Sequence, residues 1–279
     1  MKYKIFNEDC VVTMQRMIRK GYSEVDTILT SPPYNNSRVV HTERGMENLE
    51  CRYDSYDDNM TNEEYSNWTV GLFNLFDKIL KPNGKVLYNI SYGSENNECM
   101  WLTIADIVRN TNFTIADSII WKKKSALPNN VSPNKLTRIT EYIFVFCRKD
   151  EYKTFGANKK IKSISEKTGQ KFYENTFNFI EAKNNDGACK LNKATYSSDL
   201  CEQLLDIYTP PHSVVYDPFN GTGTTGVACK HKNMEWYFGS ELSKKQCDYS
   251  IERIEKEWQD WEKDRPPYIG ELLLEKIDE

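Results

Sequence analysis

The 279-residue sequence has no uninterrupted apolar run of about 18 residues, the length at which a membrane-spanning helix is expected. Its amino-terminal stretch, MKYKIFNEDC, carries charges where a signal peptide has an apolar core. These two absences predict a protein of the cytoplasm that has no membrane partner.

The chain is also poor in the residues that hold zinc or build a disulfide framework. It has three histidines, and its eight cysteines are scattered without a C-x-x-C pair. Such spacing is typical of reduced, mostly buried thiols, so we expect no metal site. The net charge of -4 excludes a protein that coats polyanions by bulk charge, but it is compatible with a local basic face.

The remaining composition favours one large α/β domain. Hydrophobic residues make up 39% of the chain and aromatic residues 13%, enough for a substantial core. Strand-like and helix-like segments alternate, which predicts a mostly parallel sheet covered by helices on both faces. The expected strands are 4–10, 25–31, 85–91, 113–122, 139–148, 214–219 and 236–240, and the expected helices include 11–20, 61–80, 98–110 and 198–208.

Helix 61–80 has the clearest signals. Thr61 and Glu64 form a capping-box pattern, and the apolar residues that follow recur at helical spacing. We interpret this stripe, which includes Trp68, as core packing with no cofactor role. Two polar segments interrupt the pattern: 35–59 is expected to be a functional or mobile loop, and 150–192 an inserted recognition region.

The stretch TILTSPPYNN, residues 27–36, ends an apolar strand on a rigid corner. Because proline fixes φ and has no N–H, the last carbonyls of this strand lose their ladder partners. Those carbonyls, the Ser31 hydroxyl and the Tyr34 ring are therefore expected to lie together. For Pro32-Pro33 alone, an ordinary strand-to-helix loop would be the better interpretation.

A second stretch, VVYDPFNGTGTTG at 214–226, runs from a strand through a glycine-rich turn into a helix. Gly221 and Gly223 let the backbone approach a ligand, although the G-x-G-x-x-G pattern alone is a weak signal. No G-K-[ST] follows, so a phosphate-cradling P-loop is excluded. Glu241, about 20 residues further on, is placed to accept ribose hydroxyls.

Three interpretations of this second stretch compete. A dinucleotide oxidoreductase would use the same turn, but the chain after it is too short unless the amino-terminal part completes the sheet. A purely structural glycine turn does not explain Asp217-Pro218-Phe219 together with Glu241. In the third, an S-adenosylmethionine site, Asp217 and the glycine turn would face the amino-acid end, Glu241 the ribose and Asp9 the adenine.

Taken together, TSPPY and DPFNGTGTT resemble the beta group of DNA amino-methyltransferases, in which the catalytic tetrapeptide precedes the recognition region and the cofactor loop comes last. NEDC resembles the adenine-contacting acid of that family, LKPNGKVLYNI its central helix-to-strand stretch and, weakly, NKATYSSDL the segment over the methionine end. The resemblance implies a circularly permuted, seven-stranded Rossmann-like methyltransferase sheet. It implies a catalytic part at 1–149, a recognition insertion at 150–192 and a cofactor part at 193–279.

The resemblance also implies roles for individual residues. The catalytic residues would be Ser31, Pro32, Pro33 and Tyr34. S-adenosylmethionine would be bound by Asp9, Cys10, Ser31, Asp217, Pro218, Phe219, Asn220, Gly221, Gly223, Thr224, Thr225, Glu241 and Leu242. Nucleic acid would be contacted by Tyr34, Asn36, Arg38, His41, Lys122, Lys123, Lys124, Lys159 and Lys160. Where the family often has His-Pro and a second proline, this chain has Asn192-Lys193 and Ser197, so no role is assigned there, although Tyr196 keeps an aromatic.

An exocyclic base amine is a poor nucleophile, and acceptors aimed at its N–H bonds would stabilise the charge that develops on it. The Ser31 hydroxyl and the Pro32 carbonyl are expected to be those acceptors, with Tyr34 stacked on the extruded base. Ser31 is too weak a base to act first, so proton loss should follow methyl transfer. Serine at the head of the tetrapeptide favours cytosine-N4, with adenine-N6 as the alternative.

The expected partner is double-stranded DNA, and a cognate restriction endonuclease and a homodimer are compatible with the resemblance. Two rival functions remain at this point. One is methylation of RNA or of a protein glutamine, and the other is a non-catalytic DNA- or cofactor-binding protein on the same scaffold.

Overall fold

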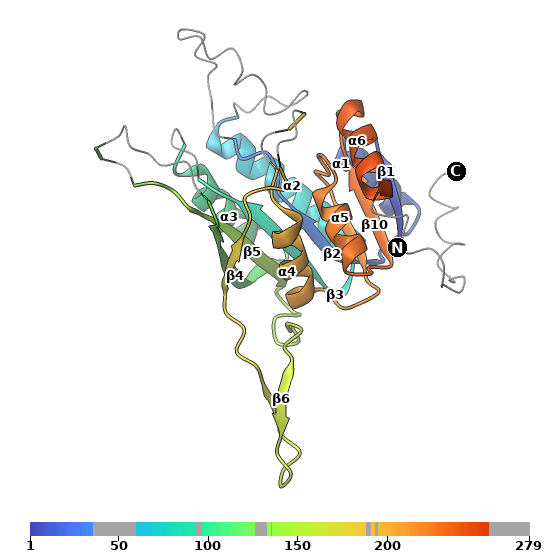
Figure 1. The fold of residues 1–279 in the computed structure, drawn as a ribbon. Coiled ribbons are helices and arrows are strands. Elements are labelled where there is room, and N and C mark those ends of the chain that lie inside the picture. Colours follow the sequence, from blue (N-terminus) through green and yellow to red (C-terminus); the bar gives the residue numbers. More distant parts are fainter. Residues whose placement is uncertain are drawn as a thin grey trace.

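The computed structural model describes residues 1–35, 60–92, 96–125, 133–134, 136–187, 191–192 and 195–256. These residues form an α/β fold around an eight-stranded sheet of order β1-β10-β9-β2-β3-β5-β4-β8 (Figure 1). Its strands are β1 (Lys2–Phe6), β2 (Val25–Thr30), β3 (Leu80–Ile90), β4 (Phe113–Lys123), β5 (Thr140–Arg148), β8 (Phe179–Ala182), β9 (Val214–Asp217) and β10 (Trp236–Ser240). The helices are α1 (Cys10–Arg19), α2 (Asn62–Ile79), α3 (Cys99–Asn110), α4 (Ser198–Tyr208), α5 (Thr224–His231) and α6 (Lys244–Lys256).

Strand direction decides where the loops meet. β1, β10, β9, β2 and β3 pair in parallel, so their carboxyl ends share one edge of the sheet, which we call the carboxyl edge. β5 is antiparallel to both β3 and β4, so β5 begins and β4 ends at this same edge. The SPPY corner after β2 and the glycine turn after β9 therefore emerge side by side.

The core consists of two apolar clusters, one on each face of the sheet. Helices α1, α2 and α3 cover one face, where Phe73 of α2 packs edge-on against Tyr88, Phe113 and Phe146 at centroid distances of 5.0–5.5 Å. Helices α4, α5 and α6 cover the other face, with Leu204 and Val227 among the buried residues. None of the described helices is long and apolar enough to cross a membrane.

The local signals read from the sequence account for most of these elements. The Thr61–Glu64 capping box is present, with both reciprocal hydrogen bonds. β3 begins at Leu80, earlier than expected, because Leu80 already pairs with Val25 of β2. The register then shifts across KPNG, where Asn83 has φ 59°, before Lys85 pairs with Thr27. The sheet has eight strands among the described residues where seven were expected, since β8 pairs in parallel with β4.

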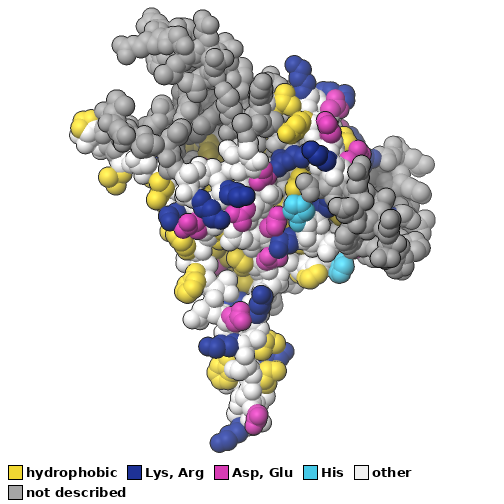
Figure 2. Space-filling view, in the orientation of Figure 1, with side chains coloured by type: hydrophobic (Ala, Val, Ile, Leu, Met, Phe, Trp, Pro, Cys, Tyr) yellow, Lys and Arg dark blue, Asp and Glu magenta, His cyan; other side chains and the backbone are white. Residues whose placement is uncertain are grey.

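The strand β8 comes from the segment expected to be an insertion, so part of 150–192 belongs to the main sheet. Between β5 and β8 lies a separate hairpin of β6 (Ile161–Ile164) and β7 (Lys171–Tyr173), which projects away from the sheet (Figure 1). All residues of both its strands are exposed, and Figure 2 shows hydrophobic side chains gathered on it beside lysines. Asn158, which leads into the hairpin, bonds to the carbonyls of Ile207 and Thr209 at the end of α4. The hairpin therefore stands at the edge opposite the carboxyl edge.

Candidate active site

The SPPY corner is anchored from two sides. The Pro33 carbonyl accepts a hydrogen bond from the buried Tyr65 hydroxyl at 2.5 Å. Asn35, at φ 53°, donates from Nδ2 to the Met60 carbonyl at 2.7 Å and accepts from the Met60 N–H at 2.9 Å. Among the described residues no hydrogen bond reaches the carbonyl of Pro32, which is a buried residue.

The glycine turn is built by positive φ angles and close packing. Gly221 has φ 50° and Gly223 φ 79°, in the left-handed region that favours glycine. A Cβ on Gly223 would lie 2.8 Å from the Ser250 Cβ. Asn220 braces the turn, since its Nδ2 donates to Ser250 Oγ and its Oδ1 accepts from the Tyr237 hydroxyl.

Asp217 ties the two motifs together. Its carboxylate accepts from the Thr30 hydroxyl at 2.7 Å, the Thr225 hydroxyl at 2.6 Å and the Phe219 N–H at 3.0 Å. Thr30 directly precedes Ser31, so one side chain connects the corner after β2 to the turn after β9. Burial raises the pKa of Asp217 above its ordinary value, although the hydroxyl and N–H donors oppose the rise.

Glu241 closes the turn from the end of β10. Its Oε2 accepts from the Gly221 N–H and its Oε1 from the Ser243 N–H, both at 2.9 Å. Burial raises the pKa of this carboxyl, and the two N–H donors act in the opposite direction.

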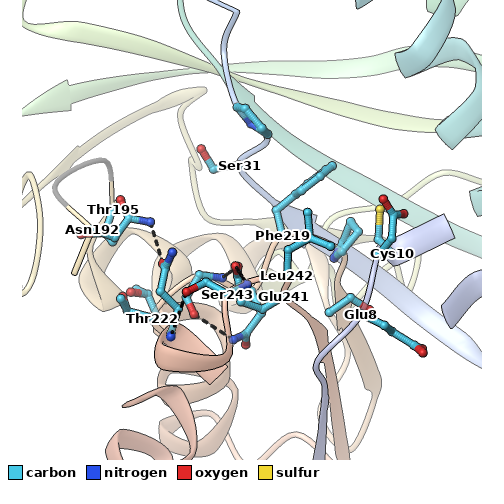
Figure 3. A pocket seen from close by; sticks show the side chains of 18 of the residues that line it. Glu8, Cys10, Ser31, Asn192, Thr195, Phe219, Thr222, Glu241, Leu242 and Ser243 are labelled. Atoms are coloured by element: carbon cyan, nitrogen blue, oxygen red, sulfur yellow. Dashed lines mark hydrogen bonds between the residues drawn. The ribbon is translucent and has the colours of Figure 1, made fainter. Parts of the chain in front are cut away.

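One pocket contains residues of both motifs. Its empty space, with the open mouth included, is about 1010 Å³. Figure 3 shows Ser31 at the top of the pocket, Asn192 and Thr195 on one side, and Glu8 and Cys10 on the other. The residues predicted to bind cofactor that line it are Asp9, Cys10, Ser31, Pro218, Phe219, Asn220, Gly221, Thr224, Glu241 and Leu242.

The family follows from comparison with known proteins. A family model described as DNA methylase, and named for N6 and N4 methyltransferases, matches residues 25–252. The chain belongs to this DNA methylase family.

Curated relatives and solved structures agree with this assignment. Type II methyltransferase M.BglII of Bacillus subtilis is 25% identical over 272 residues, which cover 91% of the methylase described here and 69% of that relative. M.Cfr9I of Citrobacter freundii is 25% identical over 154 residues, 55% of this chain and 49% of its own length. This chain therefore spans about half of M.Cfr9I.

Two solved structures share the fold. The cytosine-N4-specific PvuII DNA methyltransferase aligns with 100% of this methylase and 92% of its own chain, at a TM-score of 0.67 and 16% identity. M1.HpyAVI, solved as a complex with SAM, aligns with 90% of this chain and 99% of its own, at a TM-score of 0.59 and 20% identity. These likenesses confirm the Rossmann-like methyltransferase architecture.

Three predicted cofactor residues of the methylase do not line the pocket. Asp217 is 1% exposed and Thr225 is fully buried behind the wall, where they bond to each other. Gly223 faces Ser250 of α6. All three shape the turn from behind, so a direct contact between Asp217 and the amino-acid end of a cofactor is not what the structure favours.

Several residues that line the pocket were not predicted from the sequence. Trp68, interpreted as core packing, does pack against the core, and it also lies in the pocket wall beside Phe219 at a centroid distance of 5.7 Å. Helical spacing identifies a buried stripe but not the one position where the stripe reaches a cavity. Pro33, predicted as a catalytic residue, also lines the pocket. The lining residues for which no role was predicted are Glu8, Asn192, Thr195, Tyr196, Thr222, Ser240, Ser243 and Gln246.

Polar bonds fix several of these missed side chains. Asn192 donates to Gln246 Oε1 at 3.0 Å, and the Tyr196 hydroxyl lies 2.5 Å from Thr225 Oγ1. The Glu8 carboxylate is engaged by Thr13 and Arg16. Two further side chains, Asn89 and Glu141, contact Ser31 or Tyr34 directly, and no signal in the sequence indicated them.

The predicted nucleic-acid contacts are separated by the fold. Asn36, Arg38 and His41 lie outside the described residues. Lys122, Lys123 and Lys124 are at the carboxyl edge, where they pair with Glu181 at 2.7 Å, Glu141 at 2.6 Å and Asp199 at 3.4 Å. Lys159 and Lys160 follow Asn158 at the opposite edge, so the structure does not bring them to the pocket. Within the described ranges, no group of three His, Cys, Asp or Glu side chains is arranged to hold a metal ion.

Proposed function

We propose that this protein transfers a methyl group from S-adenosylmethionine to the exocyclic N4 amine of a cytosine extruded from double-stranded DNA. One observation carries the proposal: Ser31 of the SPPY corner and Gly221 of the glycine turn line the same pocket. The bond from Thr30 to Asp217 holds the two motifs in this arrangement.

The pocket residues fit S-adenosylmethionine. The Glu241 carboxylate has acceptor capacity beyond its two N–H bonds, which suits ribose hydroxyls. Asp9 also lines the pocket and would contact the adenine amine. Trp68 and Phe219 present an aromatic surface to the same pocket. When bound there, this cofactor supplies a methyl group activated by a positively charged sulfur.

The residues of the corner act on the target amine. The Ser31 hydroxyl and the Pro32 carbonyl would accept from its N–H bonds and stabilise positive charge as it develops. Because both acceptors are fixed before the base arrives, little reorganisation is needed during the reaction. Tyr34 would stack on the extruded base. Because the cofactor and the base would be held in one pocket, the methyl group of the cofactor would lie in line with the target amine.

The choice of cytosine rests on Ser31 at the head of the tetrapeptide, and a cytosine-N4-specific neighbour with the same fold supports it. Adenine-N6 is the second candidate, since the same acceptors suit its amine. The recognition role of 150–192, the phosphate contacts of Lys122 and Lys124, a restriction partner, a homodimer and the cytoplasmic location stay predictions.

The test is incubation of the protein with tritium-labelled S-adenosylmethionine and, separately, duplex DNA of varied sequence, RNA and protein. We expect label in DNA alone, and strongly slowed labelling with Ser31→Ala. Label in RNA or protein but not in DNA would contradict the proposal. Binding of cofactor and DNA without any transfer would favour the non-catalytic alternative.

A further inference from the structure

A carboxylate that the proposed function does not use lies behind the SPPY corner. Glu141, near the start of β5, accepts at Oε2 from the Tyr34 hydroxyl at 3.0 Å and from Asn89 Nδ2 at 3.3 Å. Its Oε1 accepts from Lys123 Nζ at 2.6 Å. The Glu141 side chain is 15% exposed, so these bonds form largely out of water.

Glu141 determines the direction of the hydrogen bonds that reach Ser31. Tyr34 has one hydroxyl hydrogen, and that hydrogen points to Glu141. Ser31 Oγ and the Tyr34 oxygen are 3.0 Å apart, so the hydrogen between them belongs to Ser31. One lone pair of Ser31 Oγ accepts from Asn89 Nδ2 at 3.2 Å, which leaves the other for an incoming N–H.

The same oxygens fix the orientation of the Asn89 amide. It is 1% exposed, and its Nδ2 faces three oxygens, those of Ser31, Tyr34 at 2.6 Å and Glu141. Its Oδ1 has no hydrogen-bond partner among the described residues. If the Nδ2 and Oδ1 atoms of Asn89 exchanged places, neither Ser31 Oγ nor Glu141 Oε2 would receive a hydrogen bond from this amide. The Glu141 carboxylate therefore also selects the orientation of Asn89.

We propose that Glu141 is a positioning residue that keeps Ser31 an acceptor toward the target amine and takes up, at the far end of the chain, the proton that the methylated amine releases. The inference rests on the proposed function. Once transfer has left a positive charge on the nitrogen, one N–H proton passes to Ser31 Oγ. The proton of Ser31 passes to the Tyr34 oxygen, and that of Tyr34 to Glu141 Oε2. The amine becomes neutral and Glu141 a carboxylic acid, which then returns its proton to water.

Among the described residues, Lys123 of β4 is the charged group that bonds to Glu141. Lys123 Nζ also lies 5.1 Å from the centroid of the Trp121 ring, which keeps the ammonium beside the carboxylate.

The test compares Glu141→Gln with Glu181→Gln and Glu141→Asp. The amide introduced by Glu141→Gln keeps the size of the side chain, but its single oxygen cannot accept from both Lys123 and Tyr34 and cannot take up a proton. Glu181 is the matched control, because it pairs with Lys122 of the same strand and is not bonded to the corner. We expect Glu141→Gln to lower kcat on duplex DNA by about 10²–10⁴-fold, as for loss of a general base. We expect its KM for DNA and its Kd for S-adenosylmethionine to stay near wild type.

Rescue by the conservative variant separates positioning from simple structural damage. Glu141→Asp, which keeps the charge, should recover part of the rate. Equal kcat in Glu141→Gln and Glu181→Gln would overturn this inference and leave the proposed function standing. The same holds for a Glu141→Gln protein that loses cofactor affinity and thermal stability together. A wild type that methylates no DNA would overturn the proposed function and this inference with it.

Discussion

At the scale of single residues, Ser31 differs from its neighbours in being surrounded by fixed partners. Asn89 donates to its oxygen, and Tyr34 accepts its hydrogen. Pro32 and Pro33 remove the backbone donors that would otherwise compete for it. The chemistry expected of this residue therefore depends on side chains from β3 and β5 as much as on the SPPY sequence.

Ser31→Ala removes one preorganised acceptor and leaves the cofactor side of the pocket intact. We expect kcat to fall by about 10²–10³-fold, while the Kd for S-adenosylmethionine, measured by calorimetry, stays near wild type. The exposed Ser118 of β4 is the control, because Ser118→Ala should change neither quantity. Parallel loss of rate and of cofactor affinity in Ser31→Ala would show that the two roles are not separate.

Asp217 allows a prediction about pH. Burial raises its pKa in the folded protein above the ordinary value, so the folded protein holds the proton more tightly than the unfolded chain. The resulting stability is fully present below the unfolded pKa and is lost as pH rises through the folded pKa. Because Asp217→Asn cannot ionise, the unfolding free energy of wild type minus that of Asp217→Asn should fall as pH rises from the unfolded pKa through the folded one. Denaturant titrations of both proteins at several pH values measure this difference in unfolding free energy. A difference that grows as pH rises would contradict the role assigned to the buried Asp217.

At the scale of elements, the glycine turn and helix α5 depend on close contact with α6. Gly223→Ala combines a φ of 79° with a Cβ placed 2.8 Å from Ser250 Cβ. We expect a loss of about 2–4 kcal/mol in unfolding free energy. Gly71 of α2 is the matched glycine, since a Cβ there meets nothing within 4 Å. Gly71→Ala should stabilise by about 0.5–1 kcal/mol, and a similar small effect at Gly223 would refute the packing argument.

Some helices and strands could be predicted from the sequence, and others could not. Local patterns predict a helix such as α2, with its capping box, and a strand such as β10, because caps and apolar periods are encoded by neighbouring residues. β8 was missed because only Ile180 and Ala182 of its four residues are buried, in a segment that is otherwise polar. This short strand forms because it pairs with the otherwise unpaired edge of β4, and a local sequence pattern does not indicate such long-range pairing.

The same limit applies to the site. Ser31 and Gly221 are marked by proline and glycine, whose backbone preferences are visible in the sequence. Glu141 and Asn89 are ordinary residues of β5 and β3, and only the pairing of Ile90 with Tyr142 brings them to Tyr34. Strand register is a property of the assembled sheet, so these partners follow from the structure alone.

At the scale of the whole molecule, the described residues divide into a pocket edge and an opposite edge. The carboxyl edge holds the SPPY corner, the glycine turn and Lys122 to Lys124, while the β6–β7 hairpin projects from the other side. On the proposed function, a DNA duplex that delivers a base to Ser31 approaches the carboxyl edge. We therefore expect the β6–β7 hairpin to take no part in the methyl transfer itself.

The central claim is that one pocket aligns an activated methyl group with an exocyclic amine of DNA. The most direct measurement is mass spectrometry of nucleosides from duplex DNA incubated with the protein and S-adenosylmethionine. The account predicts N4-methylcytosine, formed about 10²–10³-fold more slowly when Ser31→Ala replaces the wild type. N6-methyladenine would retain the amine chemistry but contradict the target base, and methylation at a ring carbon, or none at all, would contradict the claim itself.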